Sequence, residues 1–175
     1  MRLLKSPRFH DFPCQPALME MARCLLGDEV FVHPRRIGRL TFPNNAGATT
    51  PPHQDYYYIR GTINTYSCWV PLGACPVSLG GLAVWPGTHA RGYIDHTEHH
   101  PGAIGGCAVP IAPGEAVWHT TDYQAGDALF FTTFTIHKAL PNLSGTLLRV
   151  STDNRYQRPQ EEIDPGALKP HFSLD

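Results

Sequence analysis

Two side chains that can bind a metal lie two residues apart in the segment His53-Gln54-Asp55. On a β-strand, residues i and i+2 point to the same face, so His53 and Asp55 can reach one point while Gln54 turns away. Two histidines and one carboxylate on one face are the ligand set of non-haem Fe(II) sites, which keep other coordination positions open. The pair alone is a weak signal, because a complete site needs a second histidine from elsewhere in the chain.

His137 is the candidate for that second histidine. It lies in the apolar segment FTIHKAL, where a histidine needs a partner or a function. A hairpin symmetric about Leu143 would place His137 directly opposite Arg149, with Cβ atoms about 4.5–5.5 Å apart. Such a guanidinium could bind the far carboxylate of a dicarboxylate co-substrate that chelates the metal, and Ser151 on the same face could add a hydroxyl donor. An ordinary salt bridge for Arg149, or a one-residue shift of register, remains open.

Short strands must position these residues. Residues 16–26 are predicted to form a helix, because Pro16 suits the first helical turn and Gly27 suits a left-handed cap. The strands that we predict after it lie at 28–34, 37–43, 53–59, 62–72, 81–87, 127–140 and 146–157, with a loop at 44–52, a long excursion at 88–120 and a polar tail from 158 onward. This order predicts a mainly β fold, a double-sheet jelly roll with a small flanking helical part.

Composition favours a small-molecule partner. The 175-residue chain has 14 Lys and Arg against 15 Asp and Glu, a net charge of −1. No large basic field is therefore available to attract nucleic acid or an anionic membrane. The 16 glycines and 17 prolines are spread between short apolar runs, which is typical of many turns between strands. A chain of this length predicts a single domain over 1–175.

Cysteine usage predicts a cytoplasmic location. The five cysteines form no CxxC pair, and the chain shows neither a secretory apolar segment nor a long apolar span. An odd number of unpaired cysteines is ordinary in a reducing compartment. They are Cys14, Cys24, Cys68, Cys75 and Cys107.

The order of motifs resembles a known family. The segments HQD, CWVPL, GGLAVWPGTH, YQAGDALFF, TIHKALPN and LLRVSTDNRYQ, which run from about residue 25 to 157, resemble the phytanoyl-CoA dioxygenase-like family of Fe(II)/2-oxoglutarate oxygenases. The resemblance implies a double-stranded β-helix (cupin-like jelly roll) in which His53, Asp55 and His137 bind iron. It also implies that Arg149 binds the distal carboxylate of 2-oxoglutarate.

The resemblance assigns further residues to the co-substrate pocket. Trp69 matches the tryptophan that lines this pocket in the family, and Ser151 is a plausible helper. Arg39 is a candidate for an additional 2-oxoglutarate contact. Because the family has a longer N-terminal helical region, we expect this chain to be short or truncated at its N-terminus.

The activity that the resemblance implies is hydroxylation of an unidentified small molecule with O2, coupled to conversion of 2-oxoglutarate into succinate and CO2. Asp55 favours hydroxylation over halogenation, because halogenating relatives lack the carboxylate. Two alternatives remain at this point. One is a cupin-type metalloenzyme that does not use 2-oxoglutarate, and the other is a non-catalytic relative. The oligomeric state is not indicated by the sequence.

Several other residues could belong to the site. Strand alternation would point Tyr57 toward the iron, and Arg60 is either a contact for an anionic substrate or an exposed strand-end residue. His89 lies in a turn motif and is expected to be structural. The segment that contains His96, His99 and His100 is expected to be a solvated lid rather than a metal site. His119 and Trp118 could reach the pocket from the long excursion.

Overall fold

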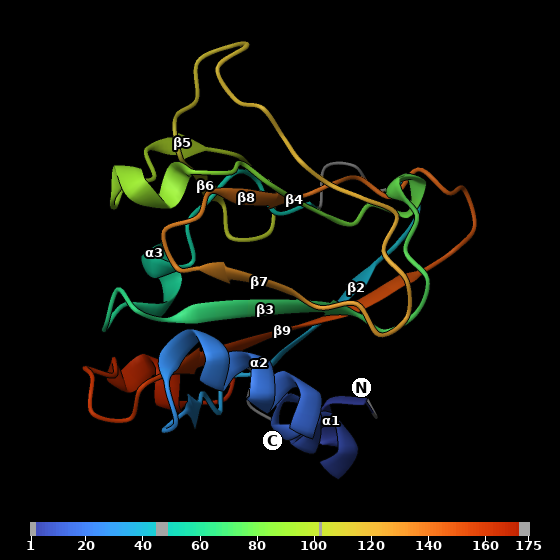
Figure 1. The fold of residues 1–175 in the computed structure, drawn as a ribbon. Helices are drawn as coiled ribbons and strands as arrows, with labels where there is room; N and C mark the ends of the chain where they lie inside the picture. Colours follow the sequence, from blue (N-terminus) through green and yellow to red (C-terminus); the bar gives the residue numbers. More distant parts are fainter. Residues whose placement is uncertain (1–2, 45–48, 102, 172–175) are drawn as a thin grey trace.

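The computed structural model describes residues 3–44, 49–101 and 103–171 and has a mainly β fold in two layers (Figure 1). The strands are β1 (Phe31–Val32), β2 (Ile37–Thr41), β3 (Tyr66–Pro71), β4 (Leu82–Val84), β5 (Glu98–His99), β6 (Cys107–Ala108), β7 (Leu129–Thr132), β8 (His137–Ala139) and β9 (Arg149–Gln157). The larger sheet has the order β1-β9-β3-β7, with β2 also paired to β9, and β4 pairs with β8 in the facing layer. The predicted jelly-roll class is confirmed.

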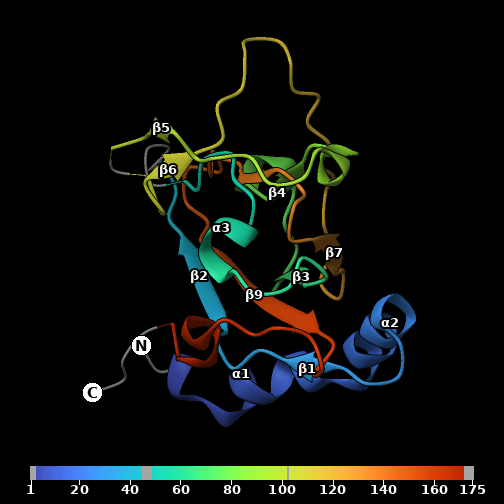
Figure 2. The ribbon, with the colours of Figure 1, turned by 90° about the vertical axis from the view of Figure 1, so that its left-hand side faces the viewer.

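Helices cover the outer face of the larger sheet (Figures 1 and 2). They are α1 (Pro7–Asp11) and α2 (Pro16–Leu26), while a third helix, α3 (Tyr56–Ile59), lies near the opening between the layers. The predicted bounds of α2 are confirmed, and Gly27 ends it with a φ of 97°. Ala22 and Leu26 of α2 pack on Cys68 and Tyr156 of the sheet. Because α1 and the short 3-10 segments Leu3–Lys5 and Phe12–Cys14 precede α2, the helical flank is larger than the single predicted helix.

Alternation along β3 and β9 decides which side chains enter the space between the layers. Cys68 and Tyr156 face the helices, so their odd-numbered neighbours face inward. Trp69 is the largest of these and packs with Tyr123 and Leu82 from the other layer in an apolar core. The inward face of β9 is polar instead, and this difference places the candidate site.

Three predicted elements differ from the structure. Residues 56–59 are helical rather than a strand, and 127–140 is divided into β7 in the larger sheet and β8 in the smaller one. The predicted hairpin that pairs His137 with Arg149 is wrong, because β8 and β9 belong to different sheets. His137 pairs instead with Val84, and Arg149 pairs with Thr41. The side chain of Asn142, which donates to the carbonyls of Thr41 and Leu147, holds the crossing between the sheets.

The remaining connections follow the predicted outline. The excursion at 88–120 contains the 3-10 segment Thr88–Arg91 and the β5–β6 pair, and the tail from 158 contains the 3-10 turn Pro165–Leu168. Residues 45–48 of the predicted loop, residue 102 of the excursion and residues 172–175 of the tail lie outside the described part. All five cysteines are free, and burial raises the pKa of Cys68 to about 12. Within the described ranges, no helix has the length and apolar character required to cross a membrane.

Gly80 lets the chain pass closely beneath the crossing between the sheets. Its φ is +80°, and a Cβ at this position would lie 2.5 Å from the carbonyl oxygen of Leu140. Gly87 has nearly the same φ, +79°, with nothing within 4 Å of the Cβ position.

We expect Gly87→Ala to cost about 1–2 kcal/mol of unfolding free energy from backbone strain alone. Gly80→Ala should cost about 3 kcal/mol or more because the backbone must also shift. Urea denaturation compares the two variants, and equal losses would contradict the close-approach argument.

Candidate metal centre

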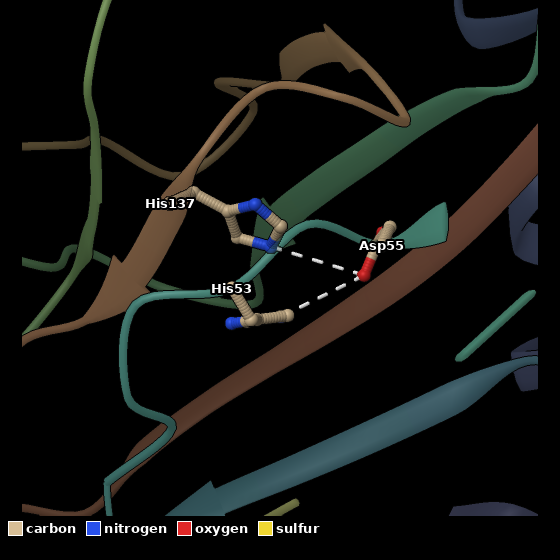
Figure 3. Close-up of side chains that lie close together, drawn as sticks. All are labelled: His53, Asp55 and His137. Atoms are coloured by element: carbon tan, nitrogen blue, oxygen red, sulfur yellow. Dashed lines mark ion pairs between the residues drawn. The ribbon is translucent and has the colours of Figure 1, made fainter. Parts of the chain in front are cut away.

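His53, Asp55 and His137 converge on one point between the layers (Figure 3). Their ligand atoms all lie within 4.8 Å of one another, and the three residues are buried. Nε2 of His53 is 3.7 Å and Nε2 of His137 is 3.8 Å from Oδ1 of Asp55. These separations are too long for hydrogen bonds, so the three atoms face a shared central position rather than each other. Among the described residues this is the group of His, Cys, Asp and Glu side chains that could hold a metal ion.

Backbone pairing brings the two histidines together. His53 and His137 form an isolated antiparallel bridge with N–H to carbonyl bonds of 2.9 and 3.0 Å, and their rings lie 4.1 Å apart. Nδ1 of His53 bonds the carbonyl of Pro51 at 2.8 Å, and Nδ1 of His137 bonds that of Thr135 at 3.0 Å. A proton on Nδ1 leaves the Nε2 lone pair directed at the centre, as a metal ligand requires. Burial and the neighbouring His53 lower the pKa of His137 to about 3, so its imidazole is neutral.

Asp55 is oriented by two inward-facing residues of the larger sheet. Its Oδ2 accepts hydrogen bonds from the hydroxyl of Ser67 and from Nε and Nη2 of Arg155, the latter at 3.0 Å. Ser67 and Arg155 are direct cross-strand partners on β3 and β9, so one register places both beside the carboxylate. Burial opposes ionisation, but the Arg155 guanidinium and the two imidazoles outweigh it and hold the pKa of Asp55 well below its usual value. Oδ1 therefore remains an ionised oxygen that faces the histidines.

Gln54 and His96 fix the turn between the two ligands. The Gln54 amide donates to the carbonyls of Gly92 and Phe134 and accepts from the backbone N–H of Ile94. The backbone N–H of Gln54 donates to Nε2 of His96 at 2.9 Å. Gln54 thus turns away from the centre and ties the residue between His53 and Asp55 to the segment 92–96.

Arg149 lies at the opposite end of the inward face of β9. It is 3% exposed, and Nη2 donates to the hydroxyl of Thr41 while its guanidinium lies 5.8 Å from the ring centre of Trp69. Trp69 and Arg149 line one small internal cavity together with the three candidate ligands. Several buried polar atoms here have no hydrogen-bond partner in the described structure. They are Nε and Nη1 of Arg149, Nε1 of Trp69 and the hydroxyl of Ser151.

The tyrosines after Asp55 lie differently from the prediction. Tyr57 was expected on the iron side by strand alternation, but the chain turns into α3 and Tyr57 stacks on His96 at 4.3 Å. Tyr58 lies beside His53 instead, with ring centres 5.6 Å apart. Arg60 is exposed and lies over the rings of Tyr56, Tyr57 and Tyr93 at 5.6–5.8 Å.

The histidine-rich excursion is only partly solvated. The expectation for His96 is wrong, because His96 is 8% exposed and bonded to Gln54. His99 is exposed and His100 half-buried, as a solvated segment requires. Trp118 contacts Lys138 and Trp85 on the outer side of the smaller sheet, and His119 bridges Val84. His89 lies exposed in its turn, and none of His89, Trp118 and His119 lines the cavity at the candidate ligands.

Two residues beside Asp55 were missed in the sequence. Arg155 continues the period-two series that begins with Arg149 and Ser151, so extending the alternation along β9 would have found it. Ser67 carries no such signal, because its role depends on the register between β3 and β9. Asp153, also in this series, pairs with Arg39.

A known protein family matches most of this chain. The family described as Phytanoyl-CoA dioxygenase (PhyH) matches residues 1–150. The chain belongs to this family.

Two relatives of this chain are hydroxylases by name. The 1-deoxypentalenic acid 11-beta-hydroxylase of Streptomyces exfoliatus is 31% identical over 93% of this chain. The methylphosphonate hydroxylase of Gimesia maris is 28% identical over 73% of this chain. This chain covers 62% of the length of the first and 46% of the second, so it spans less than two thirds of either.

Solved structures share the fold. The epimerase SnoN, in complex with Fe3+, alpha ketoglutarate and nogalamycin RO, superposes with a TM-score of 0.75 at 24% identity, over 94% of this chain and 64% of SnoN. The alpha ketoglutarate dependent carbocyclase SnoK gives 0.73 at 22% identity, over 94% and 64%. At these identities the likeness establishes the jelly-roll architecture alone.

The Asp55–Arg155 pair is expected to be a strongly coupled element of stability. Arg155→Met leaves a buried carboxylate without its cation and should cost about 3–5 kcal/mol of unfolding free energy in the metal-free protein. Since Asp55→Asn leaves the converse unpaired charge, the double variant should cost about 2 kcal/mol less than the sum of the single variants. Urea denaturation at pH 7 measures the cycle. Gln157→Met is the matched control, because Gln157 faces the same way but bonds His33, and it should combine additively with Asp55→Asn. Additivity for both pairs would refute the coupling.

His96 is expected to make folding sensitive to acid. Burial lowers the pKa of His96 to about 4, against 6.5 in an unfolded chain. The unfolded state therefore binds more protons between these values, so stability is complete above pH 6.5 and falls as the pH drops toward 4. We expect wild type to lose roughly 1–2 kcal/mol more than His96→Asn between pH 7 and 4.5 in urea denaturation. The difference isolates His96 from other buried histidines, and parallel pH curves would show that His96 is not the group involved.

Proposed function

We propose that this chain is an Fe(II)- and 2-oxoglutarate-dependent oxygenase that hydroxylates a small molecule with release of succinate and CO2. The observation that carries the proposal is the buried His53–Asp55–His137 group beside a cavity that also contains the free N–H groups of Arg149. Membership of the phytanoyl-CoA dioxygenase family and the hydroxylase names of two relatives support the same activity.

The residues present suit both iron and the co-substrate. Two imidazoles and one carboxylate are the donor set that non-haem Fe(II) takes on one face. Arg149 keeps Nε and Nη1 without a hydrogen-bond partner among the described residues, and a carboxylate is the group that suits such a buried cation. Ser151 and Trp69 add a free hydroxyl and a free indole N–H. We therefore propose that Arg149, helped by Ser151 and Trp69, holds the distal carboxylate of 2-oxoglutarate.

Bound iron with 2-oxoglutarate supplies the oxidising chemistry with O2, and the protein contributes orientation and exclusion of water. Ser67 and Arg155 keep Oδ1 of Asp55 ionised and facing the centre. The carbonyls of Pro51 and Thr135 keep the histidine Nε2 atoms available. The cavity is about 10 Å3, so we expect the co-substrate to displace the Arg39 side chain, which borders it and is 21% exposed.

Two other functions fit these residues less well. A cupin-type metalloenzyme without 2-oxoglutarate would share the triad but would have no use for the buried free N–H groups of Arg149. A non-catalytic relative would be free to lose a metal ligand, whereas His53, Asp55 and His137 are all present and oriented.

The substrate is proposed to be a small organic acid. Both hydroxylases named above act, by their names, on acids, one a carboxylic acid and the other a phosphonate. The net charge of −1 supports a small-molecule partner rather than nucleic acid. We also propose a cytoplasmic location, because free cysteines suit a reducing compartment.

Anaerobic titration with Fe(II) and then 2-oxoglutarate tests cofactor and site together. We expect wild type to develop the weak visible metal-to-ligand charge-transfer band, and His137→Ala to lose both iron and band. Arg149→Gln should bind iron normally but need about 10- to 100-fold more 2-oxoglutarate, because charge-assisted hydrogen bonds to the distal carboxylate are removed. Absorbance titration and iron analysis give both quantities.

Matched controls use exposed residues of the same types. His99→Ala and Arg91→Gln should behave as wild type, since His99 lies on β5 and Arg91 pairs with Glu115 at the surface. Iron without a band would favour the cupin-type enzyme. Failure of the wild-type protein to bind iron would favour the non-catalytic relative.

A further inference from the structure

A cavity of about 130 Å3 lies against His53 and Asp55, and Arg149 is not part of its wall. Its wall includes neither Trp69, His137 nor Arg149, and it adjoins the proposed co-substrate cavity at His53 and Asp55. It is bordered by β2 and its preceding loop, by α3 and by residues 104–105, and Figure 2 shows β2 and α3 beside each other in this region. A molecule in this cavity would meet two of the three candidate metal ligands.

Three arginines line this cavity, and two of them are neutralised. Arg155 bonds Asp55, and Arg39 pairs with Asp153. Arg35 is half-buried, and its hydrogen bond is to the carbonyl of Gly166, at 3.3 Å. It forms no ion pair with any carboxylate of the described residues. The wall therefore carries one cation whose charge the surrounding described residues do not balance.

The rest of the wall combines apolar surface with the hydroxyls of Thr50 and Tyr58 and the imidazole of His171. Ile37 and Ile59 are buried in it, and Ile104 borders it from the excursion. Tyr58 lines it beside His53. A cation next to isoleucine side chains suits a molecule with one anionic group and a hydrocarbon body.

We propose that this cavity is the substrate subsite and that Arg35 determines specificity by binding the oxyanion, carboxylate or phosphonate, of an acidic substrate. The inference rests on the proposed function and deepens it, because it assigns the acid group to a particular side chain. Binding at Arg35 holds the anionic end of the substrate in the same cavity as His53 and Asp55, so the hydrocarbon body lies next to the metal ligands. A half-buried arginine that binds no ligand is the alternative, and binding measurements distinguish the two.

Calorimetric titration with matched acids and esters tests the assignment. The probes are cyclohexanecarboxylate, methylphosphonate and 1-deoxypentalenic acid, each beside a neutral ester, which is the methyl ester for the carboxylic acids and the dimethyl ester for the phosphonate. They are titrated into the metal-free protein and into anaerobic protein with Fe(II) and 2-oxoglutarate. We expect at least one acid to bind wild type at least about 10-fold more tightly than its ester, since a charge-assisted hydrogen bond is worth about this factor.

Variants in the loop before β2 distinguish a specific contact made by Arg35 from a general effect of positive charge on acid binding. Arg35→Gln should abolish the preference for acids and leave ester binding unchanged, and Arg35→Lys should keep part of the preference. Arg36→Gln is the matched control, because Arg36 is the next residue but does not line the cavity. It should bind the probes as wild type does.

Four results would overturn the inference. They are binding of every ester as tightly as its acid, unchanged acid affinity in Arg35→Gln, no binding of any acid, or a loss of 2-oxoglutarate affinity in Arg35→Gln that would assign the residue to the co-substrate. The metal-free titrations keep these outcomes independent of the proposed activity. A wild type that binds no iron refutes the proposed function even where Arg35 binds acids.

Discussion

The buried ion pair between Asp55 and Arg155 is the constraint on which the candidate site depends. Both side chains are 3% exposed, and a carboxylate taken out of water is tolerated only with compensating charge and hydrogen bonds. Ser67 and Arg155 supply these chiefly on Oδ2, while Oδ1 accepts a longer hydrogen bond from Nη2 of Arg155 at 3.2 Å and faces His53 and His137. The ion pair thus stabilises an ionised ligand in the interior and requires a fixed register between β3 and β9.

Each of the two layers positions a different part of the candidate metal centre. The smaller layer places the two histidines side by side through the bridge between His53 and His137, whereas the larger sheet holds Asp55 by its carboxylate. The spacing of the three ligand atoms therefore depends on the distance between the layers. Apolar packing of Trp69 against Leu82 and Tyr123 sets that distance beside the site. The turn from His53 to Asp55 is fixed separately by Gln54 and His96, so backbone and side-chain positions have independent supports.

The sequence predicts the fold class and the grouping of His53, Asp55 and His137 because these depend on residue type and on the order of motifs. The helix at 56–59 is missed because Tyr56-Tyr57-Tyr58-Ile59 has the composition of a strand, and a single helical turn has no period to detect. The positive φ of Arg60, 57°, ends that turn without a glycine signal at the same residue.

The failed pairing of His137 with Arg149 has a different cause. Local turn chemistry at 141–145 resembles a hairpin, but Asn142 bonds Thr41 on β2 and so commits the segment to a crossing between sheets. Such a contact between residues far apart in sequence leaves no local trace. The conclusion that His137 and Arg149 share a cavity survives, because both side chains face the interior from opposite layers. Inward direction was predictable from alternation, whereas the strand partner was not.

Three arginines near the candidate metal centre differ in burial and in hydrogen-bond partners, and therefore in the role that each can have. Arg155 has Nε and Nη2 committed to Asp55, and its Nη1 is the one nitrogen of its guanidinium without a partner among the described residues, so it acts within the protein. Arg149 lies six residues earlier on the same face, yet two of its buried nitrogen atoms lack partners, which suits a ligand carboxylate. Arg35 is neither buried nor paired with a described carboxylate, which suits a molecule that arrives from solvent. Charge alone would not distinguish these residues. Burial and the number of free donors do, since an unsatisfied buried donor is costly unless something binds it.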